Sequence, residues 1–239
     1  MGGTGRTLEG RIALITGASR GIGAAIARRF AAEGAHVVLT ARTRAGLEET
    51  DDAVRKACGG EGATLVEMDM RDMAAIDALA PALHQRFGRL DIMVCNAGVL
   101  GTMTPVAQIA PDEWDEVIAV NLTANWRLIR ALEPLLLASD AGRAILVSSG
   151  VAPGRAYWGA YAVSKGALVS LARTWAEEMA KSTLRINVVN PGGTRTGMRA
   201  KAFPGEDPMT LKTPDEITDV FVRLAAPGCT EHGQIVNAQ

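Results

Sequence analysis

The stretch Ile12-Ala13-Leu14-Ile15-Thr16-Gly17-Ala18-Ser19-Arg20-Gly21-Ile22-Gly23 decides the fold. Its first five residues form an apolar run typical of a buried strand, and a helical pattern over 23–33 follows the glycines. The apolar run at 36–40 indicates a second strand, so together these elements predict a βαβ unit. The glycine-rich turn lies where a helix N-terminus offers free N–H groups, which is a site that suits the pyrophosphate of a dinucleotide.

Each glycine of this turn has an expected task. Gly17 permits the tight turn, Gly21 lets the backbone approach a phosphate, and Gly23 lets the helix pack closely on the strand. A flexible turn without a ligand is the alternative. The position of the turn in the first βαβ unit favours the nucleotide site.

The same alternation of apolar runs and amphipathic stretches continues along the chain. Five more strands are expected, at 63–68, 92–95, 144–148, 186–189 and 234–236. Five more helices are expected, at 45–57, 73–87, 112–138, 157–181 and 215–225. We therefore predict an α/β fold with a doubly wound, Rossmann-type, seven-stranded parallel sheet and helices on both faces. Pro134 should kink or end its helix, and the region 192–213, which has no clear period, should form a mobile loop.

Size and composition fit one globular domain. The chain has 239 residues, and we expect a flexible segment at 1–10 followed by a single domain at 11–239. Hydrophobic residues make up 48% and aromatic residues only 4%, which indicates a core built from aliphatic side chains. With 25 basic and 26 acidic residues and no basic tract, no nucleic-acid partner is expected.

The three cysteines, Cys58, Cys95 and Cys229, are far apart and have no histidine cluster beside them, so neither a disulfide framework nor a metal site is expected. No run reaches the roughly 18 apolar residues of a membrane span. We expect a soluble, cytoplasmic protein without a membrane partner.

The end of the second predicted strand bears on the choice of cofactor. An NAD-binding chain would place an acidic residue there for the ribose hydroxyls, but the sequence reads Leu39-Thr40-Ala41-Arg42. Arg42 and Arg20 can instead grip a 2′-phosphate with their planar guanidinium groups. NADP(H) is therefore preferred and NAD(H) remains possible, since Arg42 as a solvated strand end would leave the choice open.

Tyr161 and Lys165 lie four positions apart and share one face of a predicted helix. A neighbouring ammonium favours the phenolate and lowers the pKa of a tyrosine, which makes general acid/base chemistry possible. A solvated surface pair is the alternative reading of this spacing alone.

Five motifs in order resemble those of the compact, single-domain branch of the short-chain dehydrogenase/reductase family, over residues 10–236. They are the turn Thr16 to Gly23, the stretch Cys95-Asn96-Ala97-Gly98, Asn121, Ser148 with Tyr161 and Lys165, and Pro191-Gly192. Cys95 replaces the family's usual asparagine, a change expected to affect only sheet packing.

The resemblance implies a catalytic set of Asn121, Ser148, Tyr161 and Lys165. Tyr161 would exchange a proton with the substrate oxygen, and Lys165 would lower the phenol pKa and bind the nicotinamide ribose. The main chain at Asn121 would position a water, and a serine would hold the substrate oxygen. Ser148 and Ser149 compete for that last role, and the family's usual separation of thirteen residues before Tyr161 favours Ser148.

The resemblance also implies a cofactor site. Asp69 would bind the adenine amino group, with a surface aspartate as the alternative. Asn96, Ala97 and Gly98 would lie against the adenosine ribose, and Thr194 and Thr196 would contact the nicotinamide carboxamide or be ordinary loop threonines. The full expected set is Gly17, Ser19, Arg20, Gly21, Ile22, Gly23, Arg42, Asp69, Asn96, Ala97, Gly98, Tyr161, Lys165, Pro191, Gly192, Thr194 and Thr196.

These features lead us to expect an NADP(H)-dependent carbonyl reductase or alcohol dehydrogenase that acts on a small hydrophobic or amphipathic molecule. A 3-oxoacyl thioester reductase and a non-catalytic, NADP-binding regulatory protein are the alternatives. The resemblance further implies a homo-oligomer, a tetramer or a dimer, built on the two longest helices. The substrate is expected to meet a mainly apolar set: Val99, Leu100, Val151, Tyr157, Trp158 and Met198.

Overall fold

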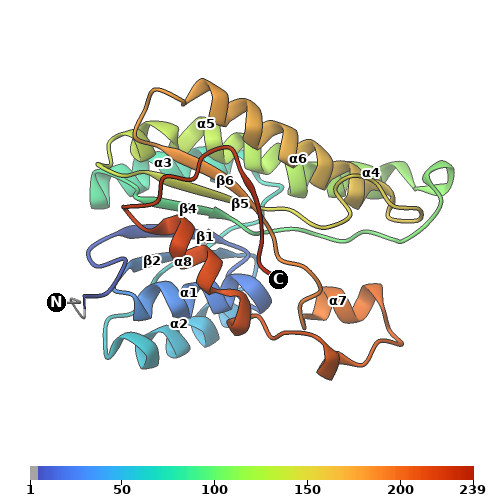
Figure 1. Cartoon of the computed structure of the whole chain (residues 1–239), viewed down its shortest axis with the longest axis horizontal. Coiled ribbons are helices and arrows are strands. Elements are labelled where there is room, and N and C mark those ends of the chain that lie inside the picture. Colours follow the sequence, from blue (N-terminus) through green and yellow to red (C-terminus); the bar gives the residue numbers. More distant parts are fainter. Residues whose placement is uncertain (1–4) are drawn as a thin grey trace.

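The computed structural model describes residues 5–239 and has a seven-stranded parallel sheet at its centre (Figure 1). The strand order is β3-β2-β1-β4-β5-β6-β7. The strands are β1 (Ile12–Thr16), β2 (His36–Ala41), β3 (Thr64–Glu67), β4 (Ile92–Cys95), β5 (Arg143–Val147), β6 (Arg185–Asn190) and β7 (Ile235–Asn237). All six strand pairs are parallel, which confirms the predicted doubly wound, single-domain α/β fold.

Two helical layers cover the sheet (Figure 1). On one side lie α1 (Gly21–Ala32), α2 (Arg44–Cys58) and α8 (Asp219–Ala225). On the other side lie α3 (Met73–Phe87), α4 (Pro111–Ile118), α5 (Ala124–Leu137) and α6 (Gly159–Glu178). The short α7 (Gly197–Ala202) stands apart from both layers, beside the open end of the sheet.

The central strands are mostly apolar because both of their faces are buried, whereas the edge strands β3 and β7 are partly exposed. Along β1, Leu14 packs in the core under α3, α5 and α6, whereas Ala13 and Ile15 pack in the core under α1 and α8. Successive side chains of a strand point to opposite faces, so such a strand contributes side chains to both cores. The two hydrophobic cores therefore hold the sheet rigid beneath the strand ends.

Several predicted elements differ from the observed ones. The turn is tighter than expected, so α1 begins at Gly21, and the helix expected at 112–138 is divided by a π-helical turn at Ala119–Thr123. Pro134 lies within α5, which continues to Leu137. The region expected to be a mobile loop contains α7. Its two ends are joined by an isolated β-bridge between Thr194 and Lys212.

Part of the segment expected to be flexible is anchored. Leu8 is fully buried, and its N–H donates to the Glu33 carbonyl over 2.9 Å. Residues 1–4 of that segment lie outside the described residues.

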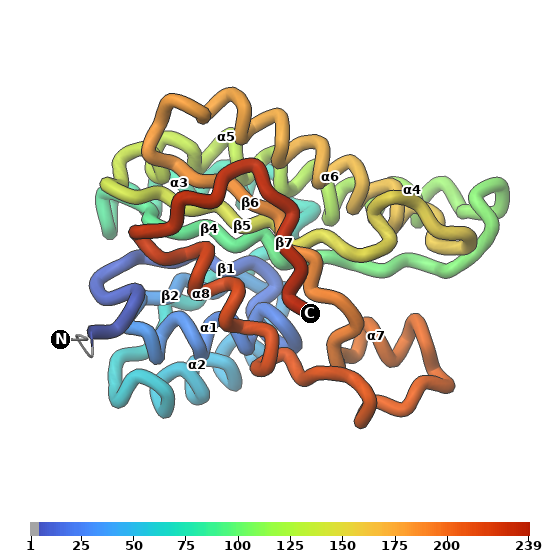
Figure 2. The backbone as a smooth tube through the Cα atoms, viewed as in Figure 1, coloured from blue at the N-terminus to red at the C-terminus, as the bar shows by residue number. Residues whose placement is uncertain are grey.

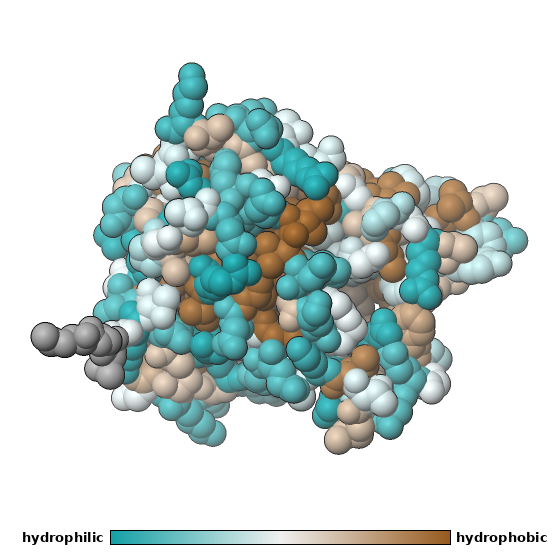
Figure 3. All heavy atoms as spheres, viewed as in Figure 1, coloured by the Kyte–Doolittle hydropathy of each residue, from teal (hydrophilic) through white to brown (hydrophobic). Residues whose placement is uncertain are grey.

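The C-terminal tail passes along the edge of the sheet and ends near the connection between β6 and α7 (Figure 2). Figure 3 shows apolar atoms gathered in the middle of this face of the molecule. Ile235 of β7 is 41% exposed. No helix over residues 5–239 is long and apolar enough to cross a membrane.

Candidate active site

The predicted motifs meet at the carboxyl ends of the parallel strands. The glycine-rich turn follows β1, Asn96 follows β4, Ser148 follows β5 and Pro191 follows β6. The strand order reverses between β1 and β4, and ligands of open α/β sheets bind in the crevice at such a switch point. The fold thus brings the sequence motifs to the position where a dinucleotide site is expected.

The glycine-rich turn has the backbone geometry that its glycines permit. Gly17 and Gly21 have φ angles of +66° and +58°, which are rare for residues with a side chain. A Cβ at Gly23 would stand 2.4 Å from the Gly17 carbonyl oxygen. The N-terminus of α1 has no side-chain cap, so its first N–H groups are free to donate hydrogen bonds to a bound anion.

Thr16 and Asn96 fasten this turn to the loop after β4. The Thr16 hydroxyl accepts hydrogen bonds of 3.0 Å from the backbone N–H groups of Asn96 and Ala97. The Asn96 side-chain amide donates to the Thr16 carbonyl over 2.9 Å. A Cβ at Gly17 would lie 2.9 Å from the Ala97 Cα, so the two loops approach each other closely. Asn96 therefore shapes the nucleotide turn as well as the adjacent loop.

The charged groups expected to recognise a 2′-phosphate are exposed. Arg20 and Arg42 both lie on the surface, and neither forms an ion pair with any residue from 5 to 239. A polar cavity of about 430 Å³ is lined by Ser19, Arg20 and Gly21, with Thr196 on its other side. These uncommitted cations and the strained glycines fit a phosphorylated dinucleotide.

Asp69, expected to bind the adenine amino group, is already paired. Arg71 donates from its side chain to both carboxylate oxygens, at 2.7 to 3.1 Å, and this contact holds the pKa of Asp69 below its usual range. An adenine amino group would have to share the carboxylate with Arg71.

Tyr161 and Lys165 are buried together on α6. Tyr161 is 8% exposed and Lys165 is 3% exposed. The Lys165 Nζ lies 5.8 Å from the centre of the Tyr161 ring and donates to the Val147 carbonyl over 2.7 Å. Burial lowers the pKa of Lys165 to about 8. This lysine therefore titrates near neutral pH rather than as a surface amine.

The expected lowering of the Tyr161 pKa by Lys165 is not what the structure gives. Burial raises the pKa of Tyr161, because the phenolate loses hydration, and a hydrogen bond with the Ser149 side chain opposes that rise. The Lys165 ammonium is directed to the Val147 carbonyl. Tyr161 is accordingly held as a protonated phenol.

The surroundings of the two hydroxyls favour Ser149 over Ser148 as the one beside Tyr161. Ser148 is buried, and its hydroxyl donates to the Lys165 backbone carbonyl over 3.2 Å. Ser149 is less buried and lies close enough to the Tyr161 hydroxyl to lower its pKa. Residue spacing favoured Ser148, whereas these contacts favour Ser149, since the Ser148 hydroxyl is turned toward the backbone of α6.

Asn121 ties the catalytic helix to the loop after β4. Its side chain accepts from the Val99 N–H over 2.8 Å and donates to the Val99 carbonyl over 2.9 Å. It also donates to the Ser164 hydroxyl, which in turn donates to the Tyr161 carbonyl. The Asn121 carbonyl, expected to hold a water, accepts from the Asn125 side chain over 2.7 Å.

Sequence reasoning missed Ser164 and Asn125 as members of this network. Their positions in the sequence were the available signal. Ser164 lies between Tyr161 and Lys165, and Asn125 follows Asn121 by one helical turn. Nothing in the spacing shows that two such polar side chains are completely buried.

A small apolar cluster surrounds Tyr161. Leu100, Val151 and Trp158 are buried there, and Met103 and Phe203 pack against them. The rings of Trp158 and Tyr161, and those of Trp158 and Phe203, are tilted with centroids 5.8 Å apart. Of the other residues expected to meet substrate, Val99 packs against the main core, while Tyr157 and Met198 are 63% and 37% exposed.

Cys95, where the family has asparagine, is a packing residue of β4. It is 1% exposed and lies in the hydrophobic core, and burial raises the pKa of its thiol to about 12. The thiol therefore stays protonated beside the site.

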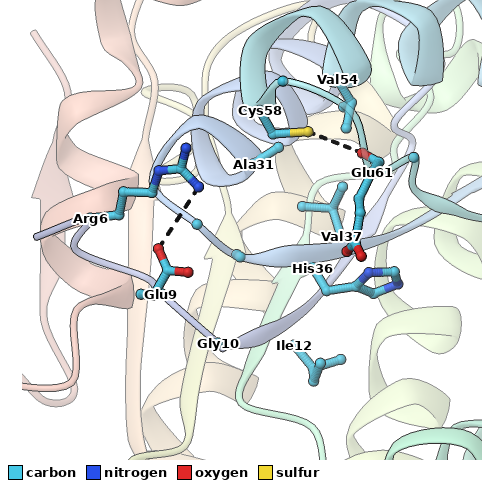
Figure 4. Close-up of a pocket in the computed structure, with 14 residues that line it drawn as sticks. Arg6, Glu9, Gly10, Ile12, Ala31, His36, Val37, Val54, Cys58 and Glu61 are labelled. Atoms are coloured by element: carbon cyan, nitrogen blue, oxygen red, sulfur yellow. Dashed lines mark hydrogen bonds and ion pairs between the residues drawn. The ribbon is translucent and has the colours of Figure 1, made fainter.

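A second cavity, of about 400 Å³, lies away from these groups (Figure 4). Ile12 and His36, the first residues of β1 and β2, line it together with Arg6 and Glu9. It is therefore at the amino ends of the strands, opposite the site. Within residues 5–239, no three His, Cys, Asp or Glu side chains are grouped so that they could hold a metal ion.

Comparison with known proteins adds a family and several relatives. A family model described as short chain dehydrogenase matches residues 11–207. The chain is 41% identical to the uncharacterized oxidoreductase YciK of Escherichia coli strain K12, over 91% of this chain and 86% of that protein. It is 36% identical to an uncharacterized NAD-dependent oxidoreductase of Mycobacterium tuberculosis, over 95% of this chain and 94% of that protein. It is 35% identical to the 3-oxoacyl-[acyl-carrier-protein] reductase FabG of Salmonella typhimurium, over 80% of this chain and 77% of that protein.

Solved structures of similar chains point to the same family. A short-chain dehydrogenase structure from Pseudomonas syringae matches with a TM-score of 0.95 and 40% identity, covering 100% of this chain and 98% of that one. A structure from Shigella flexneri 2a strain 301, complexed with NADP, matches with a TM-score of 0.94 and 39% identity, covering 98% and 99% of the two chains.

Proposed function

Because the chain belongs to the short-chain dehydrogenase family of oxidoreductases, we propose that it moves a hydride between NADP(H) and the carbonyl or secondary alcohol of an apolar substrate. The observation that carries this proposal is the buried Tyr161–Lys165 pair, which lies beside the end of β5, while the glycine-rich turn follows β1 at the same edge of the parallel sheet.

The preference for NADP(H) over NAD(H) rests on the charges of the side chains expected near the adenosine ribose. β2 ends without an acidic side chain for the ribose hydroxyls, and Arg42 and Arg20 stand uncommitted where a 2′-phosphate would lie. The relative from Shigella flexneri was solved with NADP, whereas the relative from Mycobacterium tuberculosis is named NAD-dependent. Bound NADPH supplies the hydride, and the remaining residues manage the proton and the substrate.

In the proposed reduction, the phenol of Tyr161 donates its proton to the carbonyl oxygen as negative charge develops there. The Ser149 hydroxyl donates a hydrogen bond to the same oxygen and fixes its position. The Lys165 ammonium, held by its bond to the Val147 carbonyl, keeps a positive charge 5.8 Å from the centre of the Tyr161 ring as the proton leaves. Burial of both groups excludes water and strengthens these interactions.

The lining around Tyr161 supports an apolar substrate. Leu100, Val151 and Trp158 are buried in this cluster, and Met103 and Phe203 pack against it. A buried apolar wall favours aliphatic and aromatic groups over charged ones beside the carbonyl.

A 3-oxoacyl thioester reductase is the second candidate, favoured by the 35% identity to the 3-oxoacyl-[acyl-carrier-protein] reductase. A thioester substrate would place its acyl group against the apolar cluster and its carrier outside it. A panel that includes short acyl thioesters beside simple ketones separates the two candidates.

The test of the function is a screen of carbonyls and alcohols that follows NADPH absorbance, with NADH in parallel. We expect turnover of at least one apolar carbonyl, with a kcat/KM for NADPH at least about tenfold above that for NADH. Tight NADPH binding without turnover of any carbonyl would instead support a non-catalytic, NADP-binding protein.

A further inference from the structure

The end of the chain lies over the loop that follows β6. Beyond β7, the Ala238 N–H donates to the Asn190 carbonyl over 3.0 Å, and the Asn190 side chain donates to that of Asn237 over 2.9 Å. These bonds continue the pairing of β7 with β6 and bring the tail beside residues 191–194 (Figure 2). Gln239 is thereby placed on the loop.

The Gln239 side chain binds this loop through a cluster of acceptors. Its amide nitrogen donates to the Pro191 carbonyl over 2.7 Å and to the Gly193 carbonyl over 3.1 Å. The Thr194 hydroxyl lies 3.4 Å from the same nitrogen and itself donates to the Pro191 carbonyl. An amide nitrogen carries two protons and can donate to these carbonyl oxygens. A carboxylate at the same position has no proton to donate, and its oxygens would meet the lone pairs of the carbonyls.

The loop is shaped to receive this side chain. Gly192 has a φ of +71°, and a Cβ there would stand 2.9 Å from the Gln239 amide nitrogen. Glycine at this position therefore provides both the backbone conformation and the space for the amide. Thr194 is 3% exposed, so the end of the loop that meets the Gln239 amide is enclosed by the protein.

The loop adjoins both parts of the proposed site. Asn190 at its start lies 3.6 Å from the place where a Cβ of Gly150 would stand, next to Ser149. Thr196 at its end lies 3.5 Å from the corresponding place at Gly21 in the nucleotide turn. A shift of the loop would therefore change the space between the proton donor and the phosphate site, where the nicotinamide half of the cofactor belongs.

We propose that Gln239 is a positioning residue, which holds the loop 191–194 in the shape that receives the nicotinamide half of NADP(H). The inference rests on the proposed function. Gln239 touches no reacting atom and acts only through the loop carbonyls.

The test compares two ligands in the Gln239→Glu variant, which has nearly the same shape but no donor. NADPH and 2′-phospho-ADP-ribose, which lacks the nicotinamide, are titrated by calorimetry. Loss of hydrogen bonds of this kind corresponds to about a five- to tenfold weaker Kd for NADPH. Binding of 2′-phospho-ADP-ribose should change by less than about twofold, because it does not use the loop.

Two further variants keep the test decisive. Gln239→Met removes the donor without adding charge, so it replaces Gln239→Glu if that variant does not fold, and it should show the same selective loss. Gln234→Glu is the matched control, because its exposed amide donates only to the His232 carbonyl, and it should leave both affinities unchanged.

The outcomes separate the inference from the function. Equal weakening of both ligands, or no weakening of NADPH, would overturn the role of Gln239 while the function stands. A wild-type chain that binds neither NADPH nor NADH would overturn both.

Discussion

Ser148 and Ser149 differ in what their hydroxyls touch, although they are adjacent at the end of β5. Ser148 donates to the backbone of α6, whereas Ser149 is beside the phenol of Tyr161. The residue spacing favoured Ser148, because spacing records chain length and not the direction of a side chain at a strand end. The choice between two neighbouring hydroxyls depends on the register of the strand against α6, which the sequence does not display.

This difference predicts unequal effects of two alanine substitutions. Ser149→Ala should lower kcat/KM by about 10²-fold, as loss of a donor to a developing oxyanion does. Ser148→Ala should keep kcat/KM within about tenfold of wild type and lower stability by about 1 kcal/mol, because one buried hydrogen bond is lost. Steady-state kinetics and urea unfolding measure both effects, and a larger kinetic loss in Ser148→Ala would contradict the assignment.

Lys165 and Tyr161 predict the pH dependence of the reduction. Burial lowers the pKa of Lys165 to about 8 and raises that of Tyr161, so both carry their proton below pH 8. The reduction needs both protons, and as pH rises the lysine loses its proton first. We expect kcat/KM to be constant below that pH and to fall above it.

The matched variant is Lys165→Arg, whose guanidinium stays charged across this range. Any activity it retains should lack the fall near pH 8. A wild-type profile that is flat to pH 10 would show that the ammonium is not needed.

At the scale of elements, the sequence predicted the strands well and the connections poorly. Ile12–Thr16 and Ile92–Cys95 have the predicted bounds, because an apolar run flanked by polar residues marks a strand buried on both faces. The π-helical turn at Ala119–Thr123 was not predictable, since no local sequence pattern marks it; its residue Asn121 bonds to Val99 in the loop after β4. The short α7 escaped prediction because six residues show no helical period.

The conformation of α7 depends on side-chain contacts outside the helix. Arg199 donates two hydrogen bonds of 2.6 Å to Glu206, and its guanidinium lies 3.9 Å from the centre of the Phe203 ring. Phe203 in turn meets Trp158 beside Tyr161. A helix this short is unstable by itself, so these contacts fix its position.

Glu206→Gln should therefore loosen the segment around α7. We expect cleavage by trypsin at Arg199 or Lys201 to become several times faster than in wild type, because exposure of these bonds requires local opening. Asp207→Asn is the control, since Asp207 bonds only to its own turn. Equal cleavage rates in the two variants would show that the Arg199–Glu206 pair does not hold α7.

At the scale of the molecule, we propose that the protein assembles as a homo-oligomer through α5 and α6. Trp126 and Leu137 on α5 and Val163 on α6 are 44%, 42% and 46% exposed, and Trp175 of α6 donates to Glu133 of α5, so the two helices are neighbours. Exposed apolar side chains on adjacent helices favour association. Ile235 of β7, the strand at the edge of the sheet, is a further exposed apolar residue.

Light scattering after size-exclusion chromatography tests this assembly. We expect the mass of a dimer or a tetramer for wild type and a smaller species for Val163→Glu combined with Trp126→Glu, because two charges would be buried in the interface. A wild-type monomer would contradict the proposal.

The central claim is that Tyr161 supplies the proton in an NADPH-dependent reduction. The most direct measurement compares kcat/KM and NADPH affinity in Tyr161→Phe with those in Tyr157→Phe, which alters the other tyrosine of the chain, 63% exposed. Loss of the proton donor should lower kcat/KM by about 10²- to 10⁴-fold while NADPH still binds, whereas Tyr157→Phe, which keeps its ring and loses only an exposed hydroxyl, should stay within a few fold of wild type. Activity of Tyr161→Phe within a few fold of wild type would contradict the account.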